Sequence, residues 1–82
     1  LTTESETNRP VISPNPTDEN STVTSDSKIL HIEIFDVSSR LLLSEYPKSN
    51  SYTIKANGFS KGIYLVRTTT EDGIYVNRLM VK

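Results

Sequence analysis

Cysteine is absent from this 82-residue chain, which also contains a single histidine and no tryptophan. Without cysteine the chain can form no disulfide framework, no thiolate metal site and no cysteine nucleophile. His31 lies between Leu30 and Ile32, and one histidine offers no recognisable spacing for a catalytic triad or a metal site. We therefore expect His31 to lie on a sheet face, and we predict no catalytic residue, no metal and no cofactor.

Long apolar runs and an excess of one charge are also missing. No segment approaches the ~20 apolar residues of a membrane-spanning helix, and no basic-then-apolar signal peptide opens the chain. Nine basic residues against 10 acidic ones give a net charge of −1, whereas nucleic-acid binding normally requires a basic excess. The chain starts at Leu1, so we expect a processed or excised piece whose export signal, if it has one, lay upstream.

The first third of the chain contains little core material. Residues 1–27 hold four aliphatic residues against eleven Ser or Thr. Residues 1–8 show no periodicity, and they have too little apolar surface to offset the entropy lost on ordering them. We therefore predict a flexible linker over residues 1–9 and one folded domain over residues 10–82.

The remainder of the chain has the alternating pattern of β-strands. Turn signals, which include Pro14-Asn15-Pro16, Asn57-Gly58 and Glu71-Asp72-Gly73, separate the strand-like segments. Short strands with turns about every 8–12 residues are typical of an antiparallel β-sandwich. Seven segments qualify as strands, namely 9–13, 21–25, 28–35, 40–46, 51–56, 63–70 and 74–81.

Alternation within the strands also predicts which side chains face the core. Within residues 28–35 we place Leu30, Ile32 and Ile34 on one face, and within residues 51–56 we place Tyr52, Ile54 and Ala56 inward. Gly62 opens one strand and Gly73 ends the last turn. A glycine at such a corner commonly takes a positive φ or lets another backbone approach closely.

Two groups of residues have alternative interpretations. Asp18-Glu19 and Asp26 lack the spacing of an EF-hand, so a solvated loop is favoured over a weak calcium site. Tyr52, Tyr64 and Tyr75 would form a sugar-binding surface if they shared an exposed face. We favour the alternative, in which tyrosines fill the core with their hydroxyl groups at its rim.

The last strand offers recognition without catalysis. Residues 78–82 read as strand up to Lys82, and an edge strand presents unpaired N–H and C=O groups to a partner strand. Arg78 and Lys82 either guard this edge against self-pairing or are bound by an acidic receptor. The residues alone leave both roles open.

Several motifs together resemble the C-terminal sorting domain of the type IX secretion system of Bacteroidetes. The resemblance covers Val11 to Lys82, and two departures are Ser39, where the family usually has glycine, and the sparse strand near residues 21–25. Phe59 stands at a matching position where the family usually has leucine. The matching positions are Pro14, Asn15, Pro16, Ile34, Asp36, Arg40, Leu41, Lys61, Gly62, Ile63, Tyr64, Gly73 and the end from Leu79 to Lys82.

The resemblance implies an immunoglobulin-like sandwich that directs a cargo protein through the outer-membrane translocon. It further implies transit through the periplasm, shuttle proteins as partners, and a sortase-like cysteine peptidase that cleaves within or near residues 1–9 and attaches the cargo to the cell surface. No small-molecule substrate is implied. The residues expected to be recognised by the translocon are Gly62, Tyr64, Gly73, Arg78, Leu79, Met80, Val81 and Lys82, and the turn motif is expected at Pro14, Asn15, Pro16, Asp36 and Arg40.

An alternative function is a carbohydrate- or cell-surface-binding β-sandwich appended to a secreted enzyme. Exposed coplanar aromatic side chains would favour it. A plain spacer domain is a third interpretation, and an enzyme is the least favoured.

Overall fold

A computed structural model describes residues 9–17 and 19–82 of the chain. The strands are β1 (Val11–Ser13), β2 (Asn20–Phe35), β3 (Leu41–Glu45), β4 (Ser49–Lys55), β5 (Gly62–Thr70) and β6 (Gly73–Val81), and a short 3₁₀ turn, η1, covers Ala56–Gly58. Every strand pairing is antiparallel, which confirms the predicted all-β antiparallel class. Within the described residues, no helix is long and apolar enough to cross a membrane.

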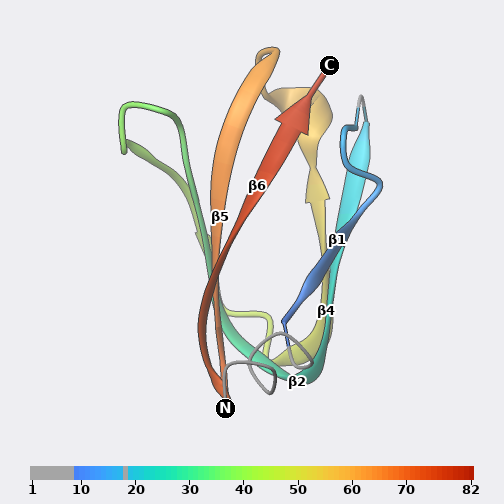
Figure 1. Cartoon of the computed structure of the whole chain (residues 1–82), viewed down its shortest axis with the longest axis vertical. Helices are drawn as coiled ribbons and strands as arrows, with labels where there is room; N and C mark the ends of the chain where they lie inside the picture. Colours follow the sequence, from blue (N-terminus) through green and yellow to red (C-terminus); the bar gives the residue numbers. More distant parts are fainter. Residues whose placement is uncertain (1–8, 18) are drawn as a thin grey trace.

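β2 organises the sheet, because β1, β3, β4 and β5 all pair with it. Its first half pairs with β1 and β4, and its second half pairs with β3 and β5. β6 adds to the outer edge of β5. Hydrogen bonding therefore joins all six strands into one curled sheet, and the predicted two-sheet arrangement is not confirmed (Figure 1).

β2 changes partners at Ser25-Asp26-Ser27, where its pairing with β4 shifts register. Small polar residues suit this bend, because they place no demand on the core and bond readily to nearby backbone. Asn50 Nδ2 donates to the carbonyl oxygens of Ser25 and Asp26, at 3.1 and 3.2 Å. The two strands predicted at residues 21–25 and 28–35 are thus continuous, so six strands form, in approximate agreement with the six or seven that were expected.

A second irregularity in β2 corrects the predicted face pattern. The pairing with β5 shifts between Ile29 and His31, so the alternation of inward and outward side chains changes phase there. Ile29, Ile32 and Ile34 are all fully buried, whereas Leu30 is exposed. The prediction that Leu30 shares a face with Ile32 and Ile34 was wrong, because a bulge cannot be seen in a periodic pattern.

The core lies between the two halves of the curled sheet. Ile12, Val23 and Ile54 come from the first half, and Val66 and Leu79 come from β5 and β6; all belong to one buried cluster. Ile54 and Ala56 are buried and Tyr52 packs against the cluster, which confirms the inward face predicted for residues 51–56. The predicted linker over residues 1–9 lies outside the described residues except for Arg9, whose guanidinium donates to the Val76 carbonyl at 2.5 Å.

Both predicted corner glycines adopt positive φ. Gly62 and Gly73 each have φ of +149°, a conformation that residues with a Cβ rarely adopt. No heavy atom lies within 4 Å of the position of a Cβ built on Gly62. Gly62 is therefore required for its backbone angle, whereas the alternative reason, close approach of another backbone, does not apply.

We predict that Gly62→Ala and Gly62→Val destabilise the domain by similar amounts. The strain lies in the backbone, at about 1–3 kcal/mol, and no neighbouring heavy atom lies within 4 Å of the Cβ position that the two variants share. Thermal unfolding of the two variants should give nearly equal losses in Tm. A valine variant that melts far below the alanine variant would contradict this assignment.

Candidate functional site

Most of the sequence motifs, which are spread from Pro14 to Lys82, meet at one end of the molecule, whereas Gly73 lies at the opposite end of the β5–β6 hairpin, where it pairs with Thr70. The segment between β1 and β2 bonds to the end of β6, and Gly62 pairs with Val81. The β2–β3 turn and the segment after η1 line a common hollow at the start of β5. The end of the chain, η1 and the β1–β2 connection lie at the same end in Figure 1. We call this region the motif end.

The edge of β6 is covered at the motif end by residues 15–17. Asn15 Nδ2 donates to the Arg78 carbonyl at 2.6 Å, and the Met80 N–H donates to Asn15 Oδ1 at 3.0 Å. The Thr17 N–H donates to the Met80 carbonyl at 2.9 Å, and the Lys82 N–H donates to the Thr17 carbonyl at 2.8 Å. The Asn15 side-chain amide therefore bonds to the edge of β6 as the backbone amide of a neighbouring strand would, and the backbone of Thr17 continues this pairing along β6.

This covering corrects the expected role of the terminal strand. An open edge was expected along residues 78–82, but its carbonyl and N–H groups at Arg78, Met80 and Lys82 are already bonded to Asn15 and Thr17. A partner strand could pair there only if residues 15–17 moved away. The sequence signal for this role was the Pro14-Asn15-Pro16 motif itself, whose partner strand could not be deduced from spacing.

Side chains at the end of β6 alternate between the core and solvent. Leu79 is fully buried and Val81 is 5% exposed, while Arg78, Met80 and Lys82 are exposed. The residues expected to be recognised thus divide into two groups. Leu79 and Val81 hold the strand in place, and the other three present their side chains outward.

Tyr64 belongs to the group that supports the fold. Its ring is 7% exposed and lies 5.0 Å from the Phe59 ring, and its hydroxyl donates to the Ser60 carbonyl at 2.6 Å. Tyr75 is also buried, and Tyr52 is half-buried. The predicted core role of these tyrosines is confirmed, and they form no exposed sugar-stacking surface. This removes the feature that would have favoured the carbohydrate-binding alternative.

Asp36 shapes the turn between β2 and β3. Its Oδ1 accepts the N–H groups of Ser38 and Arg40, at 2.9 and 3.0 Å, and Arg40 Nε lies 3.3 Å from Oδ2. The backbone N–H of Arg40 makes the largest contribution to lowering the pKa of the Asp36 carboxyl group below 3.8. Partial burial raises this pKa, but the Ser38 N–H and the Arg40 charge lower it further. The carboxylate therefore favours the turn in its charged form.

The backbone conformation of Ser39 accounts for the glycine that is usual at this position in the family that the sequence resembles. Ser39 completes the turn by donating its N–H to the Asp36 carbonyl at 2.9 Å, and it has φ of 69°. This left-handed conformation is one that glycine adopts without steric cost. An ordinary type I turn would not require this conformation.

The hollow at the motif end collects residues from three motifs. It has a volume of about 460 Å³ and lies between the β2–β3 turn and the segment that leads into β5. Arg40 stands at its rim with a side chain that is 76% exposed. The hollow is lined by Asp36, Arg40, Leu42, Gly58, Phe59, Ser60 and Tyr64.

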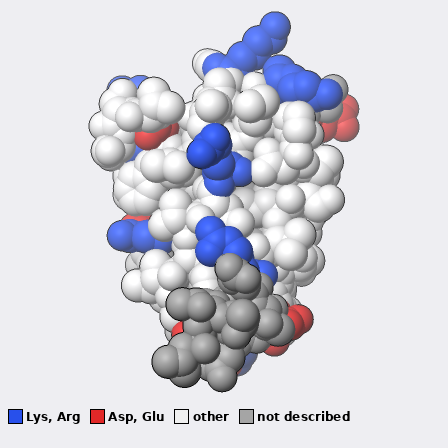
Figure 2. Space-filling view, in the orientation of Figure 1, with Lys and Arg blue, Asp and Glu red and all other residues white. Residues whose placement is uncertain are grey.

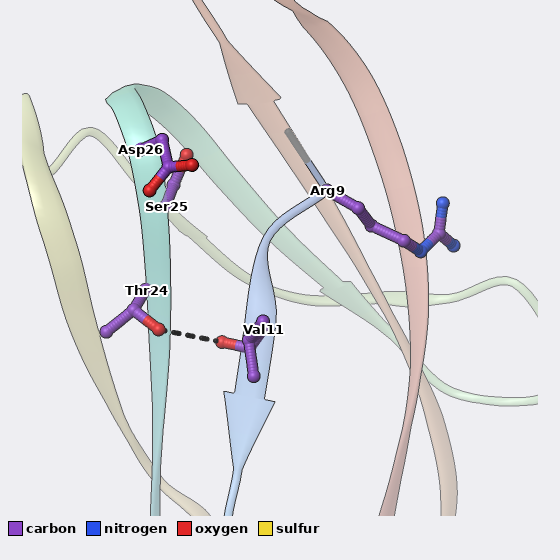
Figure 3. A pocket seen from close by; sticks show the side chains of 5 residues that line it. All are labelled: Arg9, Val11, Thr24, Ser25 and Asp26. Atoms are coloured by element: carbon purple, nitrogen blue, oxygen red, sulfur yellow. Dashed lines mark hydrogen bonds between the residues drawn. The ribbon is translucent and has the colours of Figure 1, made fainter. Parts of the chain in front are cut away.

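A second hollow, of about 170 Å³, lies beside β1 and the first half of β2. Figure 3 shows the Arg9 side chain directed away from the other lining residues, and Thr24 bonded to the Val11 carbonyl. Asp26 is the one carboxylate among the lining residues Arg9, Val11, Thr24, Ser25 and Asp26. Within the described parts of the chain, no three metal-ligating side chains gather, and Asp18 of the suggested calcium loop lies outside them.

His31 lies on the outer face of the sheet, as predicted. Its Nε2 is 2.7 Å from Ser44 Oγ, and its ring stacks on Tyr46 with centroids 4.2 Å apart. Glu33 Oε1 is 3.9 Å from His31 Nδ1, too far for a hydrogen bond, and it accepts both Nε and an Nη of Arg67 instead. Ser44, His31 and Glu33 thus lack the carboxylate–imidazole bond that orients a catalytic triad.

Comparison with known families decides what this arrangement belongs to. Residues 11–82 match the model of the secretion system C-terminal sorting domain. The chain belongs to this family of type IX secretion sorting domains. No curated protein matches the chain.

A solved structure of PorZ resembles the sorting domain in fold. PorZ is described as an essential bacterial surface component of the type-IX secretion system of Porphyromonas gingivalis. The two share 20% sequence identity with a TM-score of 0.75, and the match covers 95% of this chain but 12% of the PorZ chain. The sorting domain therefore has the length of a small part of that protein.

We predict that Asn15→Ala lowers the free energy of unfolding of the sorting domain by about 1–2 kcal/mol, because two hydrogen bonds are lost, and lowers Tm by about 5–15 °C. Asn15→Asp should cost at least as much, since a carboxylate cannot donate to the Arg78 carbonyl. Asn57→Ala, at an exposed asparagine in η1, is the matched control. Thermal unfolding checks this, and wild-type melting of Asn15→Ala would show that the amide is dispensable.

We also predict that Asp36→Asn lowers Tm at neutral pH and that this difference shrinks in acid. The folded-state pKa of Asp36 is lowered, so its stabilising effect is present above the unfolded pKa of about 3.8 and is lost as the pH falls through the folded value. Tm measured from pH 7 to pH 2 for both proteins tests the convergence. Glu71→Gln, at an exposed carboxylate in the β5–β6 turn, should show no such dependence on pH.

Proposed function

We propose that the motif end is where the type IX translocation machinery recognises this sorting domain. The domain is a C-terminal sorting signal for type IX secretion and directs a protein toward secretion or the cell surface. The observation that carries the proposal is the gathering of motifs separated by more than 60 residues in sequence, such as Asn15 and Arg78, on one end of the fold.

The proposed route has three steps. The cargo and its sorting domain enter the periplasm, where the domain folds. Shuttle and translocon components then bind the motif end and pass the cargo through the outer membrane. A sortase-like peptidase cleaves within or near residues 1–9 and attaches the cargo to the surface. The sorting domain itself carries out no reaction in this scheme.

The division of β6 side chains assigns different roles to the recognition residues. Leu79, Val81 and Tyr64 are buried, so they act by holding the strand and its neighbours in register. Gly62 and Gly73 act through their positive φ. Arg78, Met80 and Lys82 remain for direct contact with a partner, together with Arg40 at the rim of the motif-end hollow.

The test is secretion of a reporter that carries this chain in a type IX-competent cell. The reporter should appear at the cell surface or in the medium, and it should stay inside a matched strain that lacks the translocon. Equal export from both strains would contradict the proposed function.

Within this assay we predict that removal of Leu79–Lys82 abolishes export because the domain unfolds. Loss of a fully buried leucine alone costs about 2–5 kcal/mol, which is comparable to the whole stability of a small domain. Leu79 is fully buried, and the truncation also removes the bonds of residues 80 and 82 to Asn15 and Thr17. Cooperative melting of the truncated chain near the parent Tm would show that the segment acts by contact instead.

A further inference from the structure

The outward face of the β5–β6 hairpin is unusually apolar for an exposed surface. Five large hydrophobic side chains project from it, with exposed fractions of 37% for Ile63, 38% for Leu65, 65% for Ile74, 47% for Val76 and 43% for Met80. We call these residues together with Arg78 the hairpin face. Single exposed hydrophobic residues are ordinary, but neighbouring ones mark interaction surfaces.

Strand register makes the hairpin face continuous. Ile63 pairs with Met80 and Leu65 pairs with Arg78 across the hairpin. Phe35 of β2 pairs with Leu65 on the other side, and Leu41 of β3 pairs with Phe35. Paired residues share a face of the sheet, so an apolar row extends from Leu41 of β3 across β2 to Leu65 of β5 and meets Arg78 on β6.

A hollow of about 230 Å³ lies in the middle of this face. Its walls are Phe35, Leu65 and Val76, with Ser39 and Arg67 at its rim. Arg67 is held in place because its guanidinium bonds to Glu33 at 2.5 and 2.8 Å and lies 5.6 Å from the centre of the Phe35 ring. The hollow therefore has fixed walls and suits an apolar side chain of a partner.

The charges on the hairpin face favour an acidic partner. Glu33 neutralises Arg67, whereas Arg78 forms no ion pair with any acidic residue in the described part of the chain. Lys82 follows on the same strand end and is exposed. In the view of Figure 2, where β6 runs through the centre, basic side chains stand apart on an otherwise uncharged surface and acidic ones lie toward the margins.

We propose that the translocation machinery binds the sorting domain through the side chains of the hairpin face, and not by adding a strand to the edge of β6. The partner is a protein surface that places an apolar side chain in the hollow beside Val76 and a carboxylate opposite Arg78. The covered edge supports this choice, because Asn15 and Thr17 already bond the outward backbone groups of Met80. This inference rests on the proposed function and extends the proposed recognition surface from Arg78 and Met80 at the motif end along β5 and β6 to Val76.

The experiment compares variants of the chain fused to a secreted reporter in a type IX-competent cell. Val76→Glu places a charge at the hollow, and Arg78→Glu reverses the cation that faces the partner. Each should lower the exported reporter by about tenfold or more, since like-charge contact at an interface is strongly unfavourable. Arg78→Lys should keep most of the export because it keeps the charge.

Two controls separate binding from folding. Thr53→Glu changes an exposed residue of β4, in the other half of the sheet, and should be exported normally. The Tm of each purified variant should stay within a few degrees of wild type, because Val76 and Arg78 project outward. If Val76→Glu lowers Tm substantially, the proposal is tested by Arg78→Glu alone. Lower export of Arg78→Glu at an unchanged Tm would then support binding through the hairpin face, and normal export would contradict it.

Each other outcome overturns a different part of the proposal. Retention of the wild-type fusion would overturn the proposed function and this inference with it. Export of the wild type together with normal export of Val76→Glu and Arg78→Glu would overturn the inference alone. Improved export of Asn15→Ala, which opens the β6 edge and leaves the hairpin face intact, would show that the partner pairs with the edge. A dimer in sedimentation that Val76→Glu dissociates would identify a second copy of the chain as the occupant.

Discussion

The fold depends on one strand, β2 (Asn20–Phe35), which pairs with four of the other five strands. A continuous strand can serve both halves of a curled sheet only if it bends, and β2 does so at Ser25–Ser27. The β5–β6 turn closes on this bend, since the Glu71 N–H donates to the Lys28 carbonyl and Ser27 Oγ bonds to Asp72. The bend of β2 and the β5–β6 turn lie at one end of the molecule. The β1–β2 connection, the β2–β3 turn and the end of β6 lie together at the other end, which is the motif end.

Closure of the β6 edge links stability to function. A terminal edge strand is a hazard in a protein that must stay unaggregated during export, because it can pair with any other free strand. Here the Asn15 amide and the Thr17 backbone occupy that edge. Pairing with β5 keeps Leu79 in the core and directs Arg78 and Met80 outward, so the motif covers the backbone edge while these two side chains stay exposed to a partner.

Much of the fold followed from local pattern, and its failures have local causes. Alternation identified β4, β5 and β6, because each buries side chains on one face. The apolar centre Leu41–Leu43 identified β3, in which Leu43 alone is partly buried. Alternation divided β2 in two at Ser25–Ser27 and placed Leu30 on the same face as Ile32 and Ile34, since neither a polar bend within a strand nor a bulge leaves a periodic signature. At the site, the motif residues were recognised but not their partners: nothing near Asn15 in sequence indicates Arg78, and Ser39 gives no sign of its left-handed backbone.

By itself the sequence determined the all-β class, the turns at Gly73 and Asp36, the inward face of residues 51–56 and the family. These are short-range properties, set by side-chain alternation and by the φ that each residue tolerates. The tertiary structure decided that the strands form one sheet, that the β6 edge is covered, and that Leu65, Val76 and Arg78 share one face. Those outcomes depend on which strands pair and in what register. Pairing brings together residues that are far apart in the sequence, and their separation along the chain does not indicate that they are in contact.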